Sequence, residues 1–305
     1  MTNGFDDERT GGDSTRLWLR YRCQGAEYLP PEYYSALLKP YIFDGCSDVE
    51  LFRRFLSRLQ LKNHPRVLEI GPGTGRATSV LLESVEPVQL NLLDQSHRML
   101  KFLDNFIPSR VNTSYLVNDA IKFCATTDES FDLIYSLWSI SHSIHQFLYR
   151  SGLESGARTV VNALQRLLTT SLAPGGYLYL LHFDSTSHEQ EIALRQRSKI
   201  FTFLRPGETS PSQLMIEQVL RDAALHGQVA FEKTHYVGAP IVYANLEEAM
   251  EIFMNFHMEG YFNDSPQVTK VIAELERDLK THEMNDGRIS ITPACTVYVC
   301  QKPAR

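Results

Sequence analysis

The chain has 305 residues, a formal net charge of -6 and a hydrophobic content of 43%, values typical of a globular protein with a sizeable core. The acidic balance argues against a nucleic-acid partner, because phosphate binding needs clustered Lys and Arg. No stretch approaches the roughly 20 apolar residues of a membrane span, and the polar N-terminus lacks the apolar centre of a signal peptide. We therefore expect a cytoplasmic protein with no membrane or nucleic-acid partner.

Neither the basic residues nor the cysteines indicate a special site. Arg195, Arg197 and Lys199 follow helical spacing and are interpreted as a solvated helix face. The five cysteines form no CxxC pair, so neither a disulfide framework nor a metal site is predicted. We interpret them as buried thiols of a reducing compartment; they are Cys23, Cys46, Cys124, Cys295 and Cys300.

The first 65 residues are predicted to form a disordered tail followed by a helical lid. Residues 1–14 are polar and acidic, and the segment 15–41 is rich in tyrosine. Asp48 is interpreted as the N-cap of a helix that runs to Leu59 with one apolar face.

An alternation of strands and helices begins at Arg66 and continues to Phe183. Strands are predicted at 66–70, 88–94, 113–119, 131–140 and 177–183, and helices at 78–83, 97–106 and 157–171. This order is typical of a doubly wound parallel sheet.

The pattern loosens after Asp184. Helices are expected at 211–226, 245–258 and 265–282, with one strand at 229–236 and a single closing strand within 288–302. The predicted fold is α/β: a Rossmann-like, doubly wound, mostly parallel sheet of seven strands, with N-terminal helices and a helical cap near the C-terminus. We accordingly expect a tail and lid at 1–65, a core at 66–185, and cap helices with closing strands at 186–305.

A glycine-rich loop follows the first core strand, in the segment VLEIGPGTGRAT. A dinucleotide fingerprint needs GxGxxG, whereas Gly71, Gly73 and Gly75 give GxGxG, and Arg76 stands where the third fingerprint glycine would be. The loop also lacks the Lys and Ser/Thr of a P-loop. It therefore predicts no pyrophosphate cradle, and a tight turn without a ligand is the structural alternative.

Three acids stand at the ends of three successive predicted strands, and this edge is where open α/β sheets bind ligands. Glu69 would repel a phosphate but favour a cation or an amino group. Asp94 is placed to accept hydrogen bonds from ribose hydroxyls, and Asp119 from an adenine amino group. S-adenosylmethionine carries a sulfonium and an ammonium group and no phosphate, so it fits this pattern. Each acid alone is also typical of a helix cap or a turn.

The run from Arg66 to Phe183 resembles a class I S-adenosylmethionine-dependent methyltransferase, with VLEIGPGTG, NLLDQS, VNDA, FDLIYSL and LAPGGYLYL in order. The resemblance implies methyl transfer, with S-adenosylmethionine as cofactor and S-adenosylhomocysteine as product. The cofactor-binding residues that follow are Glu69, Gly71, Gly73, Gly75, Asp94, Gln95, Asp119, Ala120, Ser136 and Leu137.

A weaker resemblance links nearly the whole chain to histamine N-methyltransferase and its relatives, through the helical front end, FDLIYSLWSI and the tail of two helices and a strand. The sequence departs from this family where histamine is bound. Trp138 replaces a polar amide, Ser141-His142 replace two tyrosines, and Pro293 aligns with an asparagine. The resemblance therefore implies a small amine or phenolic acceptor other than histamine.

Histidines near the predicted strand ends are the candidates for a general base, because imidazole titrates near neutral pH. His142, just past the fourth strand, is the first choice and His182 the second; His145 and His257 are further candidates. Aromatic residues that could close over the acceptor by stacking or cation–π contact are Tyr28, Trp138, Phe256 and Tyr261.

The leading hypothesis is methylation of N or O on a small molecule. Methylation of a protein or nucleic acid is one alternative, although no Asn/Asp-Pro-Pro-aromatic run follows the fourth strand, where Ser136-Leu137-Trp138-Ser139 stands. A catalytically idle cofactor-binding scaffold is the other. The acceptor, the choice between N and O, and the oligomeric state are left open.

Overall fold

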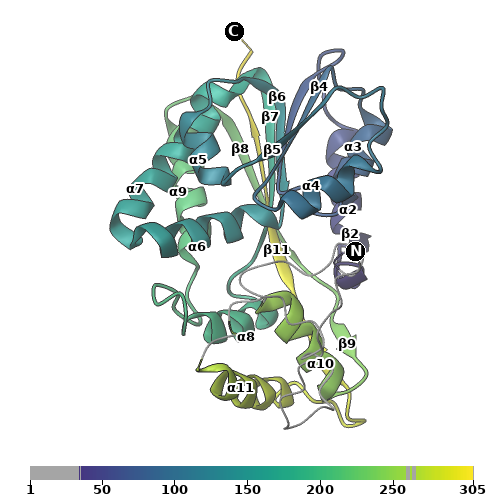
Figure 1. Cartoon of the computed structure of the whole chain (residues 1–305), viewed down its shortest axis with the longest axis vertical. Helices are drawn as coiled ribbons and strands as arrows, with labels where there is room; N and C mark the ends of the chain where they lie inside the picture. The colour runs from purple at the N-terminus through teal and green to yellow at the C-terminus, as the bar shows by residue number, and fades with distance from the viewer. Residues whose placement is uncertain (1–33, 35, 259–261, 263–265, 305) are drawn as a thin grey trace, which may run out of the picture.

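The computed structural model describes residues 34, 36–258, 262 and 266–304. Its centre is a sheet of seven strands in the order β5-β4-β3-β6-β7-β11-β8 (Figure 1). The strands are β3 Arg66–Ile70, β4 Gln89–Asp94, β5 Thr113–Val117, β6 Phe131–Leu137, β7 Leu172–Phe183, β8 Ala230–Val237 and β11 Ala294–Gln301. In this order the first five strands, β5, β4, β3, β6 and β7, are parallel to one another. Strand β11 is antiparallel to both of its neighbours, β7 and β8. The predicted Rossmann-like, mostly parallel sheet is confirmed.

Helices cover both faces of this sheet (Figure 1). They are α2 Asp48–Leu56, α3 Arg76–Ser84, α4 His97–Asp104, α5 Ala120–Thr126, α6 Ser139–Ser151, α7 Leu153–Arg166, α8 His188–Arg197, α9 Pro211–Leu225, α10 Leu246–Ile252 and α11 Val268–Lys280. Two π-helical segments extend α7 and α10, at Leu167–Ser171 and Phe253–His257. Two small antiparallel pairs complete the structure: β1 Ile42–Phe43 with β2 Cys46–Ser47, and β9 Ile241–Tyr243 with β10 Ile289–Ile291.

The core consists of two layers, one on each face of the sheet, because successive strand side chains point to opposite faces. Val67 and Leu133 join the layer packed against α2, α3 and α4, whereas Leu68 and Ile134 join the layer packed against α5, α6, α7 and α9. Burial on both faces explains why these strands read as continuous apolar runs.

Helices α8, α10 and α11 lie together beyond the carboxyl ends of the parallel strands, in the lower part of Figure 1. Two ion pairs join α8 and the segment after it to α11: Arg195 to Asp278 at 2.9 Å and Lys199 to Glu274 at 2.6 Å. No helix in the described part of the chain is long and apolar enough to cross a membrane.

Several predicted boundaries were wrong. The fourth core strand ends at Leu137 and not at residue 140, because Trp138 takes a left-handed conformation (φ 66°) and α6 begins at Ser139. The single closing strand is two strands, β10 and β11, separated by Thr292-Pro293, since proline cannot donate to a sheet ladder. Helix α8 contains Arg195 and Arg197, which were interpreted as part of a helix face, although no bounds were predicted for this helix.

Three interpretations of single residues were also tested. Ser47 caps α2, its Oγ accepting from the Glu50 amide at 3.3 Å, so Asp48 is a buried first-turn residue and not the cap. Arg197 is buried and does not belong to a solvated face. The described cysteines are buried free thiols, as expected: Cys46, Cys124, Cys295 and Cys300. Cys23 lies outside the described residues.

Candidate cofactor and acceptor site

The glycine loop joins β3 to α3, and all three of its glycines have positive φ. A Cβ on Gly71 would lie 1.9 Å from the Oγ of Ser139, and one on Gly75 would lie 2.3 Å from Cδ2 of Leu103. These two positions need glycine for packing as well as for conformation. A Cβ on Gly73 would meet nothing within 4 Å, so this residue faces open space.

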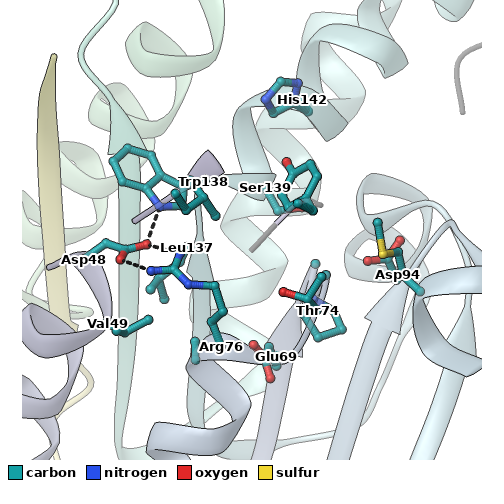
Figure 2. Close-up of a pocket in the computed structure, with 17 residues that line it drawn as sticks. Asp48, Val49, Glu69, Thr74, Arg76, Asp94, Leu137, Trp138, Ser139 and His142 are labelled. Atoms are coloured by element: carbon teal, nitrogen blue, oxygen red, sulfur yellow. Dashed lines mark hydrogen bonds and ion pairs between the residues drawn. The ribbon is translucent and has the colours of Figure 1, made fainter. Parts of the chain in front are cut away.

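That open space is a pocket at the carboxyl edge of the sheet, which we call the loop pocket. Its volume is about 80 Å³. Figure 2 shows the side chains of its wall, which include residues of α2, β3, the glycine loop, α3, β4, α4, β6 and α6. The polar residues among them are Asp48, Glu69, Thr74, Arg76, Asp94, Ser139 and His142.

Glu69 lies at the base of the loop pocket and is almost completely buried. Its Oε2 accepts hydrogen bonds from Thr78 Oγ1 at 2.6 Å and from the Tyr135 hydroxyl at 2.7 Å. Burial raises its pKa to about 7, even though both hydrogen bonds act in the opposite direction. A cation in the pocket would favour the charged carboxylate, as expected for a group that receives an amino or sulfonium ligand.

Asp94 ends β4, next to Glu69 in the sheet order. Its Oδ1 accepts from the Ser96 amide at 2.8 Å, and burial raises its pKa to about 6. Asp94 lines the loop pocket and also a second, smaller hollow, the strand-end pocket, whose wall includes Gln95, Asp119 and Ala120. The two pockets share Gly71, Asp94 and Ser139 in their walls, so they are neighbours along the ends of β3, β4 and β5, and we call the pair the groove.

Asp119 follows β5 and caps α5. Its Oδ1 accepts from the amides of Ile121 at 2.9 Å and Lys122 at 3.1 Å, and its Oδ2 accepts from Arg150 Nη2 at 2.8 Å. The carboxylate is therefore fixed in the strand-end pocket by the cap. A bond to an adenine amino group would be added to these contacts.

A cluster of three side chains, two buried and one half-buried, lies in the wall of the loop pocket (Figure 2), and we call it the Asp48 clamp. Arg76 donates from both terminal nitrogens to Asp48, at 2.6 and 2.9 Å, and the Trp138 indole Nε1 donates to Asp48 Oδ2 at 2.8 Å. The clamp joins α2, α3 and the turn after β6. In the sequence, Arg76 was considered only as the residue at the position of the third fingerprint glycine. In the structure it is part of the pocket wall.

The structure brings most of the predicted cofactor residues to this groove. Leu137 lines the loop pocket, and Gln95 and Ala120 line the strand-end pocket. Ser136 is buried, and its hydroxyl donates to the Ile70 carbonyl at 2.8 Å, which joins β6 to β3. It lines neither the loop pocket nor the strand-end pocket. Gly75 supports the loop through its contact with Leu103 and does not line the groove either.

His142 lies one helical turn into α6, above Ser139 in Figure 2. It lines the loop pocket and a third hollow, the histidine cavity, whose wall also includes His145, His182, His257 and Arg197. Burial, and next the charge of Arg197, holds the pKa of His142 well below its usual value. The imidazole is therefore neutral at pH 7.

His182, the second choice, lies in the histidine cavity and not in the loop pocket. Its Nδ1 is 2.5 Å from the Phe183 carbonyl and its Nε2 is 3.1 Å from the Ser212 hydroxyl. Burial lowers its pKa to about 4. With both ring nitrogens engaged, His182 is better suited to hold the wall of the cavity than to move a proton.

The predicted acceptor residues are only partly within the described chain. Trp138 lines the loop pocket and packs against Phe183, with ring centroids 4.1 Å apart. Phe256 lines the histidine cavity, and Tyr28 and Tyr261 lie outside the described residues. Sequence reasoning missed Asp48, Thr74 and Ser139 in the loop pocket, and Arg197 in the histidine cavity. No local pattern marks Asp48 or Arg197, because their partners Trp138 and His142 are distant in the sequence. Thr74, in contrast, lies within the glycine loop itself.

Part of the chain is similar in sequence to known methyltransferases. Residues 67–162 match the family described as "Methyltransferase domain". The malonyl-[acyl-carrier protein] O-methyltransferase of Marinomonas sp. (strain MWYL1) is 33% identical over 100 residues, which are 32% of this chain and 37% of that protein. The chain therefore spans well under half the length of this curated relative.

Solved structures share the fold at low identity. The YcgJ protein from Bacillus subtilis has a TM-score of 0.52 and 15% identity, covering 84% of this chain and 98% of its own. Loganic acid methyltransferase with SAH has a TM-score of 0.52 and 9% identity, covering 84% and 92%. The cyclopropane synthase MmaA2 from Mycobacterium tuberculosis has a TM-score of 0.50 and 15% identity, covering 95% and 100%. Residues 67–162 are therefore similar to a methyltransferase domain, and the solved structures show that the chain shares their fold.

Proposed function

We propose that the whole chain is an S-adenosylmethionine-dependent methyltransferase that acts on N or O of a small molecule. The observation that carries this proposal is the position of His142, which lines both the loop pocket and the histidine cavity. A neutral imidazole stands there at the boundary between the groove that would hold the cofactor and a separate polar cavity.

The residues of the groove fit the cofactor. Gly73 leaves open the space that a side chain would fill, and Glu69 supplies a buried carboxylate for a cationic amino-acid end. Asp94 lines both pockets and would accept hydrogen bonds from the ribose hydroxyls. Asp119 lines the strand-end pocket and would accept a hydrogen bond from the adenine amino group. When bound, S-adenosylmethionine supplies an electrophilic methyl group on its sulfonium. The division of the chain at residues 65 and 185 into lid, core and cap belongs to this proposal.

The chain's own contribution is alignment, exclusion of water and control of one proton. Methyl transfer is an in-line displacement, so correct positioning of the acceptor accounts for much of the rate. Trp138, held by Asp48, forms an apolar wall beside the reacting region. His142 would receive the proton of an acceptor hydroxyl, or hold an amine in its neutral form.

The nature of the acceptor is supported from two directions. The curated relative is named as an O-methyltransferase of a malonyl group on a carrier protein, which favours oxygen in a small acyl acceptor. The resemblance to histamine N-methyltransferase, in the helical front end and the tail, favours a small amine. We keep both under the proposal of a small acceptor, and a protein substrate or an idle scaffold remain the competing functions.

Ligand-dependent thermal denaturation tests the proposal. S-adenosylhomocysteine should raise the melting temperature by mass action, whereas NAD, NADP and ATP should leave it unchanged. A shift with NAD and none with S-adenosylhomocysteine would restore the dinucleotide interpretation. Incubation with methyl-labelled S-adenosylmethionine and a metabolite library then separates turnover from mere binding, because a scaffold would bind the cofactor without labelling any small molecule.

A further inference from the structure

The histidine cavity is rich in neutral polar groups and carries one permanent positive charge. Four imidazoles and Arg197 face it, and none of the described residues that line it is acidic. Burial lowers the pKa of His145 to about 3 and that of His182 to about 4, so both imidazoles are neutral near pH 7. Arg197, only 6% exposed and 3.3 Å from His142 Nδ1, is then the charged group of the wall.

A buried carboxylate behind this wall, that of Glu189, has its own partners. Glu189 is completely buried and accepts from the Tyr41 hydroxyl and, at 3.4 Å, from Gln190 Nε2. It lies 3.4 Å from His257 Nε2 and does not line the cavity. Asp184, which pairs with His235, also lies behind the wall. Among the described residues that line the cavity, Arg197 therefore supplies the permanent charge, which attracts an anion.

His145 gives a second, independent sign of a ligand. It is 5% exposed, and its Nε2 has no hydrogen-bond partner among the described residues. An unsatisfied buried polar atom is costly and calls for an explanation. A ligand oxygen in the cavity would satisfy it.

The size of the cavity restricts what can enter. Its volume is about 20 Å³, against about 80 Å³ for the loop pocket. That is room for one or two waters, or for a compact planar group, but not for a ring. His142 lines both hollows, so the two are neighbours at this side chain. A ligand that reaches both would have its small charged end in one and its larger part in the other.

We propose that the histidine cavity binds a carboxylate of the methyl acceptor, with Arg197 and His145 as its hydrogen-bond donors. The acceptor then lies across His142, and its reacting atom is in the loop pocket beside Trp138. This inference rests on the proposed function and narrows it to acceptors that carry a carboxylate in addition to the group that is methylated. Arg197 is suited to the role because its planar guanidinium matches a carboxylate in two hydrogen bonds.

Calorimetric titration with benzoate and its neutral isostere benzamide tests the inference, with and without S-adenosylhomocysteine. We expect benzoate to bind the wild-type protein at least about 10-fold more tightly than benzamide. Arg197→Met should weaken benzoate binding by about 10- to 100-fold, the usual effect of losing a hydrogen bond to a charged group. The affinity of the Arg197→Met variant for S-adenosylhomocysteine should equal that of the wild-type protein. The matched control is Arg195→Met, on the same helix but with a side chain that is 45% exposed.

The outcomes separate the inference from the proposed function. Equal affinities for benzoate and benzamide, or an equal loss of benzoate binding in the two arginine variants, overturn the carboxylate site. Failure of the wild-type protein to bind S-adenosylhomocysteine refutes the proposed function instead. Should Arg197→Met not fold, Arg197→Lys keeps the charge without the planar fork, and a weaker preference for benzoate over benzamide is then the expected result.

Discussion

Replacement of Asp48 by Asn should destabilise the protein far more than a surface charge mutation. The Asp48 side chain is 1% exposed, and its two oxygens accept three hydrogen bonds, two from Arg76 and one from Trp138. Asparagine keeps the shape but offers one acceptor oxygen and no charge. A guanidinium that is 20% exposed is then left beside a neutral amide.

The size of the effect follows from the burial of the pair. Removing one partner of a buried ion pair costs about 3–5 kcal/mol. Because the introduced amide would still accept one hydrogen bond and Arg76 keeps some contact with solvent, we expect the lower end, about 3 kcal/mol. Against a total stability of about 5–15 kcal/mol, such a loss is easily measured.

Urea denaturation followed by circular dichroism gives the free energy of unfolding of each variant. Asp128→Asn is the control, since that side chain is 90% exposed in its ion pair with Arg166 and should cost less than about 1 kcal/mol. Adding Arg76→Met to Asp48→Asn should recover part of the loss, because it removes the unpaired charge. A loss below about 1 kcal/mol for Asp48→Asn, or additive effects in the double variant, would refute the role of the clamp.

Three further predictions concern the groove and its base. Asp94→Ala should weaken S-adenosylmethionine binding by about 1–3 kcal/mol in calorimetry, the cost of hydrogen bonds lost from a charged acceptor; unchanged affinity in a folded variant removes Asp94 from the site. Because burial raises the pKa of Glu69 from 4.5 to about 7, the folded state binds this proton more tightly than the unfolded chain does. The free energy of unfolding of the wild type, relative to Glu69→Gln, should therefore fall by about 3 kcal/mol as the pH rises from 4.5 to 7, and parallel pH curves for the two proteins would contradict this. His142→Ala should lower turnover of an acceptor found by the library screen by about 10²–10⁴-fold while cofactor affinity stays the same; near-normal turnover excludes His142 as the base.

The sequence predicts the sheet and its acidic edge because both depend on local patterns. Apolar runs followed by Glu69, Asp94 and Asp119 lead directly to three adjacent strand ends, and the structure has these strands side by side. The glycine spacing likewise distinguishes this loop from a dinucleotide fingerprint. Local patterns are sufficient wherever a residue's role depends on its own strand or turn.

The clamp and the histidine cavity could not be predicted, because they depend on contacts between distant segments. Asp48 reaches Trp138 across 90 positions of sequence, and Arg197 reaches His142 across 55. Helix α6 was missed for another reason: its sequence SISHSIHQF is rich in serine and histidine, which are weak helix formers. The residue before the helix, Trp138, takes a left-handed conformation and makes no side-chain cap. That conformation cannot be predicted from the residue type.

The position of β11 has a consequence for the order in which the protein can be assembled during synthesis. In the described chain β8 pairs only with β11, and β11 also covers the edge of β7, yet it is translated after both. Until residues 294–301 leave the ribosome, β7 presents an unpaired edge and β8 has no neighbour in the sheet. An exposed strand edge can pair with another chain, and nascent domains with such edges are prone to aggregate. The parallel half of the sheet can form early, whereas the half that includes β8 must wait for the strand between them.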